Sequence, residues 1–181
     1  MDAKPLTTRE ALLAHGKRLF WLNGYANVSV RDITGAAGVD GALVSRYFGG
    51  KLGLFKETLS QMDTLDIAGI PDREALISEL VRIFDEAERS PDVPTVITLT
   101  LANARDPEAA PLVKEAMDAR WQKPLAELLG SEALAAMVTA VTFGMSVAEK
   151  TLCLEGIHRP GTPAYRAQIE HILRAALESP E

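Results

Sequence analysis

The first fifty residues carry their own helix start and stop signals, and this punctuation limits the folds that the chain can adopt. Thr7 and Glu10 have the spacing of a capping box, in which the hydroxyl accepts a backbone N–H while the carboxylate reaches back to the N-cap residue. Ser29 and Asp32 repeat that spacing. Glycine, which readily adopts the left-handed conformation at helix ends, follows at positions 24, 38, 49 and 50. We therefore expect short helices separated by glycine stops.

These signals predict a helix that ends at residue 23, a short helix over 30–37 and another over 41–48 with Asp40 as its N-cap. Apolar residues stand where two short helices need them to pack near a right angle: Ile33, Ala37, Val39, Val44 and Tyr47. A tight turn with a glycine joins the two helices, as in a helix-turn-helix, whose second helix lies in the major groove of DNA. The pattern therefore predicts a DNA-binding unit over residues 29–51.

The rest of the chain also shows apolar side chains at helical spacing. Helices are predicted over 51–62, 72–89, 107–129, 132–154 and 163–177. Residues 93–104 are rich in β-branched side chains, which favour strands by propensity. Because an isolated strand would have no partner in this chain, we predict a buried helix there. The fold class that we expect is all-α.

Charge is divided unevenly along the chain, whose net charge is −6. Residues 1–60 hold eight Lys and Arg against five Asp and Glu, a net charge of +3. The other residues hold eleven basic and twenty acidic side chains, a net charge of −9. The first part can approach phosphates, whereas the second would be repelled by them. Chance can also divide charge unevenly, so the motifs must decide.

Several functional classes find no support in the composition. Cys153 is the single cysteine, so a disulfide within the chain is excluded. The three histidines are far apart and match no metal spacing, and we find neither a glycine-rich phosphate loop nor a Ser-His-Asp arrangement. We expect no metal, no cofactor and no enzymatic activity. Because no apolar run approaches the roughly 18 residues of a membrane span and residues 1–9 are polar, we expect a cytoplasmic protein without a membrane partner.

Motifs over about residues 9–55 resemble the bacterial tetracycline-repressor (TetR) family of transcriptional regulators. They are Leu19-Phe20, Gly24-Tyr25, Val28-Ser29-Val30-Arg31-Asp32-Ile33, Ala36-Ala37-Gly38-Val39, Tyr47-Phe48, and Lys51 with Leu54-Phe55. Several elements at fixed spacing are more specific than one short motif. The resemblance implies an N-terminal three-helix helix-turn-helix domain at 1–55 and a C-terminal helical ligand-binding and dimerisation domain at 56–181. The helix that begins at Lys51 would link the two.

In function, the resemblance implies a DNA-binding transcriptional regulator, a repressor released from operator DNA by a small-molecule effector. The sequence departs from the family pattern at Thr34, Asp40, Gly41 and Ser45. Gly41 weakens the recognition helix by about 1 kcal/mol relative to Ala, and Asp40 puts a carboxylate near the phosphates. A helical binding or interaction protein that has lost its DNA function is therefore an alternative. Salt-dependent binding to DNA would separate the two readings. An all-α enzyme is a further reading, but the sequence shows no set of catalytic residues for it.

Eight residues of the helix-turn-helix are candidates for contact with double-stranded operator DNA: Ser29, Arg31, Gly41, Ala42, Ser45, Arg46, Tyr47 and Lys51. Arg46 can donate two hydrogen bonds to guanine, and Ser45 can also reach base edges. Arg31 can reach a phosphate or a base edge, and Ser29 stands at a helix N-terminus, where the dipole favours anions. Gly41 and Ala42 would allow the helix to approach DNA closely, and the Tyr47 hydroxyl and Lys51 would bind phosphate.

The second half supplies candidates for an effector pocket and a homodimer interface. An unidentified small apolar effector is expected to contact Phe84, Thr98, Met117, Trp121, Met137 and Phe143, although a core position is the simpler interpretation of any one of these residues. The family resemblance places dimerisation in the last two long helices. Small residues there recur every four positions and would permit close packing between helices: Ala136, Ala140, Gly144 and Ala148.

Overall fold

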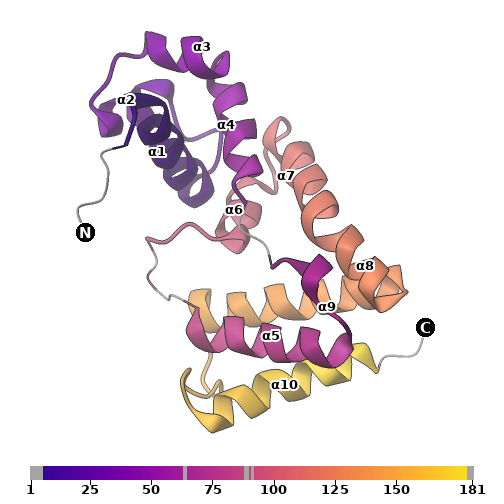
Figure 1. The fold of residues 1–181 in the computed structure, drawn as a ribbon. Coiled ribbons are helices and arrows are strands. Elements are labelled where there is room, and N and C mark those ends of the chain that lie inside the picture. The colour runs from indigo at the N-terminus through magenta and orange to yellow at the C-terminus, as the bar shows by residue number, and fades with distance from the viewer. Residues whose placement is uncertain (1–5, 63–64, 88–89, 91, 179–181) are drawn as a thin grey trace. The chain divides into compact units, whose positions relative to one another are not determined.

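The computed structural model describes residues 6–62, 65–87, 90 and 92–178, and the regular secondary structure within these residues is helical (Figure 1). The all-α prediction is confirmed. The chain divides into two compact units, an N-terminal unit (residues 1–63 and 92–116) and a C-terminal unit (residues 64–91 and 117–181). The predicted division into a DNA-binding domain (1–55) and an effector and dimerisation domain (56–181) assigns functions to parts of the chain. The compact units do not test it, so it stays a prediction.

The N-terminal unit contains the predicted helix-turn-helix. Its helices are α1 (Thr8–Asn23), α2 (Val30–Ala37), α3 (Ala42–Phe48), α4 (Lys51–Ser60), α6 (Val96–Asn103) and most of α7 (Ala109–Met117). Both expected capping boxes are present, at Thr7 with Glu10 and at Ser29 with Asp32. The core of this unit includes fully buried side chains from four helices: Leu12, Phe20, Ile33, Val44, Leu54 and Phe55. The local signals therefore set the helix starts, and the apolar faces bring the helices together.

The start of α3 differs from the prediction by one residue. The helix begins at Ala42 with Gly41 as its N-cap residue, whereas the sequence pointed to Asp40 in that role. The Asp40 carboxylate still accepts a hydrogen bond from the backbone N–H of Ala42, at 2.7 Å. Asp40 therefore satisfies one of the free N–H groups of the first turn without standing at the N-cap itself.

The threonine-rich segment 93–104 is helical, as predicted, but α6 starts only at Val96, and Leu99 and Asn103 are its only buried residues, so the predicted burial holds for one side of the helix. Thr95 and Thr98 form a third capping box, which the sequence analysis did not identify. The Thr100 hydroxyl donates to the carbonyl oxygen of Val96 at 2.8 Å, so it is satisfied within the helix. Because the threonine hydroxyls find local partners, the segment can be helical despite its β-branched composition.

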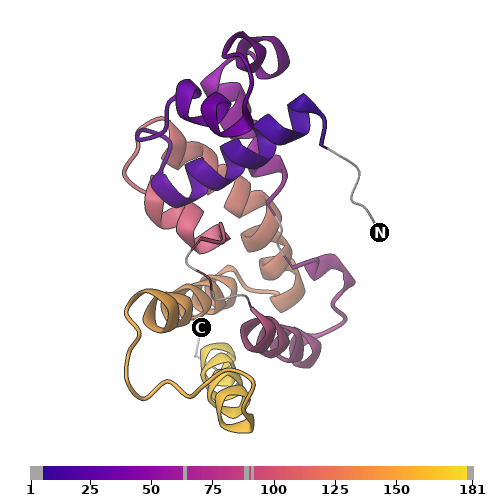
Figure 2. The same cartoon turned by 90° about the vertical axis from the view of Figure 1, so that its left-hand side faces the viewer.

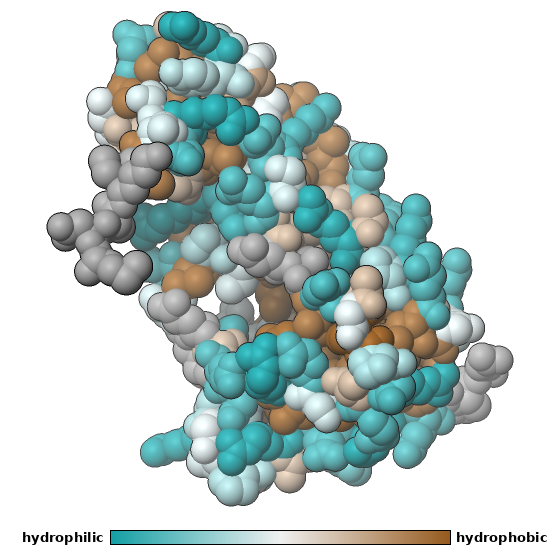
Figure 3. Space-filling view, in the orientation of Figure 1, coloured by the Kyte–Doolittle hydropathy of each residue, from teal (hydrophilic) through white to brown (hydrophobic). Residues whose placement is uncertain are grey.

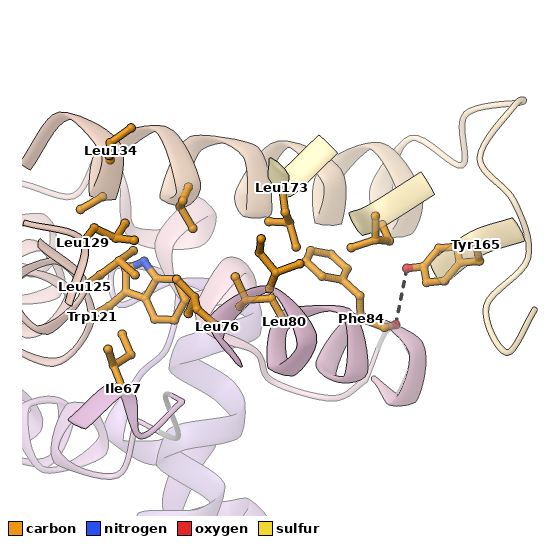
Figure 4. Close-up of a cluster of buried hydrophobic side chains, with 14 residues drawn as sticks. Ile67, Leu76, Leu80, Phe84, Trp121, Leu125, Leu129, Leu134, Tyr165 and Leu173 are labelled. Carbon is orange, nitrogen blue, oxygen red and sulfur yellow. Dashed lines mark hydrogen bonds between the residues drawn. The ribbon is translucent and has the colours of Figure 1, made fainter. Parts of the chain in front are cut away.

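The C-terminal unit is built around a hydrophobic cluster. Its elements are the 3₁₀ turn η1 (Ile67–Gly69), α5 (Arg73–Glu86), the π turn η2 (Asp118–Gln122), α8 (Lys123–Leu129), α9 (Glu132–Ser146), the π turn η3 (Val147–Thr151) and α10 (Pro163–Leu177). Helix α10 packs against α5 and α9 (Figures 1 and 2). Hydrophilic side chains cover much of the face drawn in Figure 3, with hydrophobic residues between them. Buried Leu76, Leu80, Leu125 and Leu173 lie in the core (Figure 4).

Two long helices of the sequence analysis are interrupted by π turns. The predicted helix 107–129 contains η2, which ends at Gln122, two residues before Pro124. A proline has no backbone N–H, so the regular hydrogen-bond pattern cannot continue unchanged there. The predicted helix 132–154 ends earlier, in η3, where the N–H of Leu152 donates to the carbonyl oxygen of Val147. The predicted helix 72–89 ends at Glu86, and residues 88 and 89 lie outside the described chain.

Two glycines inside helices give a matched test of this packing. A Cβ at Gly53 would overlap the carbonyl oxygen of Phe48, a backbone atom that cannot move aside freely. At Gly35, a Cβ would meet nothing within 4 Å. We expect Gly53→Ala to destabilise the fold by about 1–3 kcal/mol. Gly35→Ala should stabilise it by up to about 1 kcal/mol, because alanine favours helix. Chemical denaturation followed by circular dichroism measures the free energy of unfolding of both variants. Equal changes in the two variants would contradict the close approach of Gly53 to the Phe48 carbonyl oxygen.

Candidate nucleic-acid interface

The two helices of the helix-turn-helix are fixed by buried side chains and a closed turn. Ile33 on α2 and Val44 on α3 are fully buried. Helix α2 ends at Gly38, which has the left-handed conformation (φ 67°, ψ 33°) that the sequence predicted. The N–H of Val39 donates to the carbonyl oxygen of Thr34 at 3.0 Å. Thr34, which departs from the family pattern, is buried and donates its hydroxyl to the Arg31 carbonyl, so this departure leaves no unsatisfied polar group.

The outer face of α3 is exposed along its whole length. Small residues lie at its start, Gly41 and Ala42, and longer polar ones follow, Ser45, Arg46 and Tyr47. Arg31 on α2 is exposed as well. Among the described residues, neither Arg31 nor Arg46 forms an ion pair, so both guanidinium groups are available to an external anion. A short exposed helix with this order of side chains is suited to enter a DNA groove closely at one end and to read bases at the other.

Ser29 is already engaged in its cap. Its hydroxyl donates to the Asp32 carboxylate at 2.7 Å and accepts the N–H of Asp32 at 3.1 Å. The hydrogen bonds from the hydroxyl and backbone N–H of Ser29 hold the pKa of Asp32 below its usual value. A phosphate contact from Ser29 would therefore have to compete with the helix cap. The phosphate role of Ser29 stays a prediction.

Lys51 lies at the first turn of α4, and its ammonium group stands over an aromatic ring. Its Nζ atom is 4.1 Å from the ring centroid of Tyr25, which follows α1. The Tyr25 ring in turn packs on Phe20 and Phe55, with centroid separations of 5.7 and 5.1 Å. The position of Lys51 in the sequence predicted a phosphate contact but gave no sign of this aromatic partner. The structure therefore adds a fixed support beneath a lysine that is a candidate for DNA contact.

Two residues that hold this unit together escaped the sequence analysis. Arg9 donates to the Glu57 carboxylate at 2.8 Å, and its guanidinium lies 5.0 Å from the ring centroid of Phe48, so it fastens α1 to the end of α3 and to α4. Asn103 is fully buried in α6 and hydrogen-bonds the backbone at the end of α1. Local spacing gives no signal for the Arg9 contacts. A lone amide at the end of an apolar segment was a signal for Asn103, because a buried amide needs partners.

The six effector candidates are divided between the two compact units and between buried and exposed positions. Phe84 and Trp121 belong to the buried cluster of the C-terminal unit (Figure 4). Met117 is half-buried and packs against that cluster. The Trp121 indole N–H donates to the Thr139 hydroxyl at 2.8 Å. Two further candidates on α9, Met137 (41% exposed) and Phe143 (half-buried), are outside that cluster.

The sixth effector candidate, Thr98, lies in the other compact unit. It belongs to α6, in the N-terminal unit, where it takes part in a helix cap. A common pocket for the six candidates stays a prediction.

Helix α9 has one buried and one exposed side. Leu134, Ala135 and Val138 are buried, whereas Ala136, Ala140 and Gly144 of the small-residue stripe are exposed and Ala148 is half-buried. By length and composition alone, the helix 132–151 could cross a membrane, a finding that the sequence analysis did not anticipate. The core helix of a soluble protein passes the same test, so the finding is weak evidence. In the part of the chain that the structure describes, no three His, Cys, Asp or Glu side chains are grouped to hold a metal.

Comparisons with known proteins agree with this geometry. Residues 12–58 match the family model for bacterial regulatory proteins of the tetR family. No curated protein sequence matches the chain. Among solved structures, NalD of Pseudomonas aeruginosa, the secondary repressor of the MexAB-OprM multidrug efflux pump, is similar with a TM-score of 0.69 at 19% identity, over 93% of this chain and 94% of that one.

Two regulators from Streptomyces coelicolor share the fold as well. The putative transcriptional regulator SCO7518 is similar with a TM-score of 0.64 at 21% identity, over 95% of this chain and 99% of that one. The TetR-family regulator SCO4454 gives 0.62 at 19% identity, over 94% of each chain. Identities this low carry the fold alone, whereas the family model matches the helix-turn-helix itself. Residues 12–58 are therefore similar to the helix-turn-helix of bacterial regulatory proteins of the tetR family, and the whole chain shares the fold of the solved regulators.

Proposed function

We propose that this protein is a transcriptional repressor that binds operator DNA as a homodimer and leaves it when a small apolar molecule binds. The observation that carries the DNA-binding part is the exposed face of α3 within a segment that matches the TetR family model. The repressor role is supported by the similarity in fold to NalD, which is itself a repressor. We further propose residues 1–55 as the DNA-binding domain, residues 56–181 as the effector and dimer domain, a cytoplasmic location and no enzymatic activity.

The DNA contacts follow from where the basic side chains lie. Arg46 is on the exposed face of α3, so it is the side chain best placed to donate to a guanine. Arg31 lies on α2, the helix that crosses the sugar-phosphate backbone in this motif, and Lys51 stands at the start of α4. We therefore assign base reading to Arg46 and phosphate binding to the other two. Ser45 and Ala42 complete the base-facing surface, and Ser29, Gly41 and Tyr47 remain candidates for backbone contacts.

Alanine substitutions separate these roles. Arg31→Ala and Lys51→Ala should each weaken binding to every DNA sequence and reduce the slope of log affinity against log salt by about 0.9, because each removes one phosphate contact. Arg46→Ala should relax the preference at particular bases by about 1–3 kcal/mol. Bound sites are first selected from genomic fragments, and affinity is then measured by fluorescence anisotropy. Lys123→Ala, which removes an exposed charge from the C-terminal unit, is the control.

If all three helix-turn-helix variants bind as the unmodified protein does, the assignment of the DNA surface is wrong. If the unmodified protein itself shows no salt-dependent binding to any DNA, the alternative of a helical interaction protein without DNA function takes its place.

The homodimer is supported by the one-sided burial of α9. In its most apolar window of 18 residues, 28% is buried within the chain, which leaves an apolar surface without cover from its own unit. The exposed residues on this side are small, so a second helix can approach closely. On α10, Ala164, Ala167 and Ala175 are exposed in the same way. A second copy of the chain that packs α9 and α10 against their equivalents would cover both faces.

A bulky residue in this stripe should break the dimer. Ala140→Trp and Gly144→Trp would each force a large ring into a helix contact, so we expect monomers in sedimentation and much weaker operator binding. The thermal stability of the N-terminal unit should change little. Ala119→Trp, at an exposed alanine of η2 outside the stripe, is the matched control. Intact dimers in both stripe variants would refute this interface.

The effector role is proposed for the apolar cluster around Trp121. Pockets for small molecules are mostly apolar with few polar groups, and here Trp121 has a polar partner in Thr139 and apolar neighbours such as Phe84 and Met117. A molecule that binds there must favour one conformation of the repressor over another to alter DNA binding. The fluorescence of Trp121 can report such binding, because the indole is nearly buried.

We expect a protein with Trp121 as its sole tryptophan to detect the effector. Trp21→Phe removes the other tryptophan, and the Thr58 hydroxyl that Trp21 contacts keeps its bond to the Phe55 carbonyl. In a panel of apolar drug-sized compounds, one that changes the emission should also release operator DNA, with the same concentration dependence. Adding Trp121→Phe should abolish the fluorescence signal, whereas the release of operator DNA by the compound can still be measured. Release of DNA with unchanged Trp121 emission would place the pocket elsewhere.

A further inference from the structure

The ring of Tyr25 packs against Phe20 and Phe55 and lies beneath the ammonium group of Lys51. Tyr25 is 7% exposed, and its ring lies between the aromatic core and the Lys51 Nζ atom, which is 4.1 Å from the ring centroid. Lys51 is the first residue of α4, where the positive end of the helix dipole disfavours a cation. The negative face of an aromatic ring attracts a cation and offsets this repulsion. The position of the Tyr25 ring therefore helps to set the position of the Lys51 ammonium group.

The backbone of Tyr25 is held by the C-terminal end of α6. The Asn103 Oδ1 atom accepts the Tyr25 N–H at 2.7 Å, and the Asn103 amide donates to the carbonyl oxygens of Phe20 and Leu99 at 3.3 and 2.8 Å. The preceding residue, Gly24, has a positive φ of 85°, and a Cβ there would lie 2.6 Å from the Ala102 carbonyl oxygen. The end of α1 and the end of α6 are thus in direct backbone contact.

The start of α7 places negative charge near the side chain of Tyr25. Glu108 lies just before α7. Burial of the phenol and the negative charges of Glu108 and Asp106 raise the pKa of Tyr25 to about 12. The same negative charges favour the position of the Lys51 ammonium group over the Tyr25 ring.

We propose that Tyr25 is a positioning residue for Lys51, that Asn103 holds Tyr25 in place, and that the charge of Glu108 favours the lysine over the ring. This inference rests on the proposed function, in which Lys51 binds a DNA phosphate. An ammonium group has several N–H donors, so one side can face the ring while another meets the phosphate. Fixing the long lysine side chain over the ring also removes part of the entropy cost of ordering it on DNA. A residue without any DNA contact thereby tunes a phosphate contact.

The test uses the full-length protein and a DNA duplex of random sequence, whose binding depends on phosphate contacts. Tyr25→Phe keeps the ring but removes the hydroxyl, and Glu108→Ala removes the nearby carboxylate from an exposed position. Both should weaken binding roughly two- to fivefold and lower the salt slope by up to about 0.9. Glu115→Ala, at an exposed acid of α7 in the same compact unit, is the matched control. It should not weaken binding, because loss of a negative charge alone favours DNA.

A double-mutant cycle with Lys51→Ala identifies the route of the effect. In the Lys51→Ala background, Tyr25→Phe and Glu108→Ala should no longer change affinity or slope. If they weaken binding equally in that background, Tyr25 acts on the fold rather than on Lys51, and the inference is overturned. The same holds if Lys51→Ala weakens binding but the two variants behave like Glu115→Ala. If Lys51→Ala has no effect, the proposed phosphate contact fails, and the positioning role fails with it.

Discussion

A buried amide is the contact on which the N-terminal unit depends most. The side-chain amide of Asn103 connects α6 to backbone atoms in the last turn of α1 and at Tyr25, so the contact fixes the path of the chain there. A buried amide that lost these partners would be costly, because its polar groups would remain without hydrogen bonds away from water. The aromatic residues at the end of α1 and in α4 pack beside this point. The helix-turn-helix is thus supported from α6, a helix more than forty residues further along the chain.

The parts of the fold that follow from local chemistry were predictable. The capping boxes at Thr7 and Ser29 and the glycine at 38 act within one turn of their own position. The starts of α1 and α2 and the end of α2 could therefore be predicted to within a residue or so. The π turns were not predictable in the same way, although Pro124 offered a hint for one of them, because a π turn depends on how a helix packs as well as on its residues. The position of Lys51 in the sequence suggested a phosphate contact. It gave no sign of the Tyr25 ring beneath the ammonium group, because that contact depends on how α1 and α4 pack.

The two functional surfaces differ in what the sequence could say about them. On α3, the candidate residues are exposed because Val44 is buried and Leu43 and Phe48 are half-buried on the inner side of a seven-residue helix, and this follows from the short helix and its spacing. The effector candidates were chosen for apolar character, a property that cores and pockets share. Phe84 and Trp121 are core residues in this fold, and Met137 is exposed, so apolar character alone did not distinguish a pocket wall from a core or an outer face.

The glycine pair between α3 and α4 has the composition of a flexible joint, with positive φ at both Gly49 and Gly50. The packing on either side removes that freedom. Gly53 brings the first turn of α4 against the Phe48 carbonyl, and Arg9 spans the Phe48 ring and Glu57 on α4. A Cβ at Gly49 or Gly50 would meet nothing within 4 Å, so the joint itself is open, and the contacts at Gly53 and Arg9 hold α3 against α4. The recognition helix is therefore a rigid extension of α4, so a rotation of α4 would be delivered to it undiminished rather than absorbed at the joint.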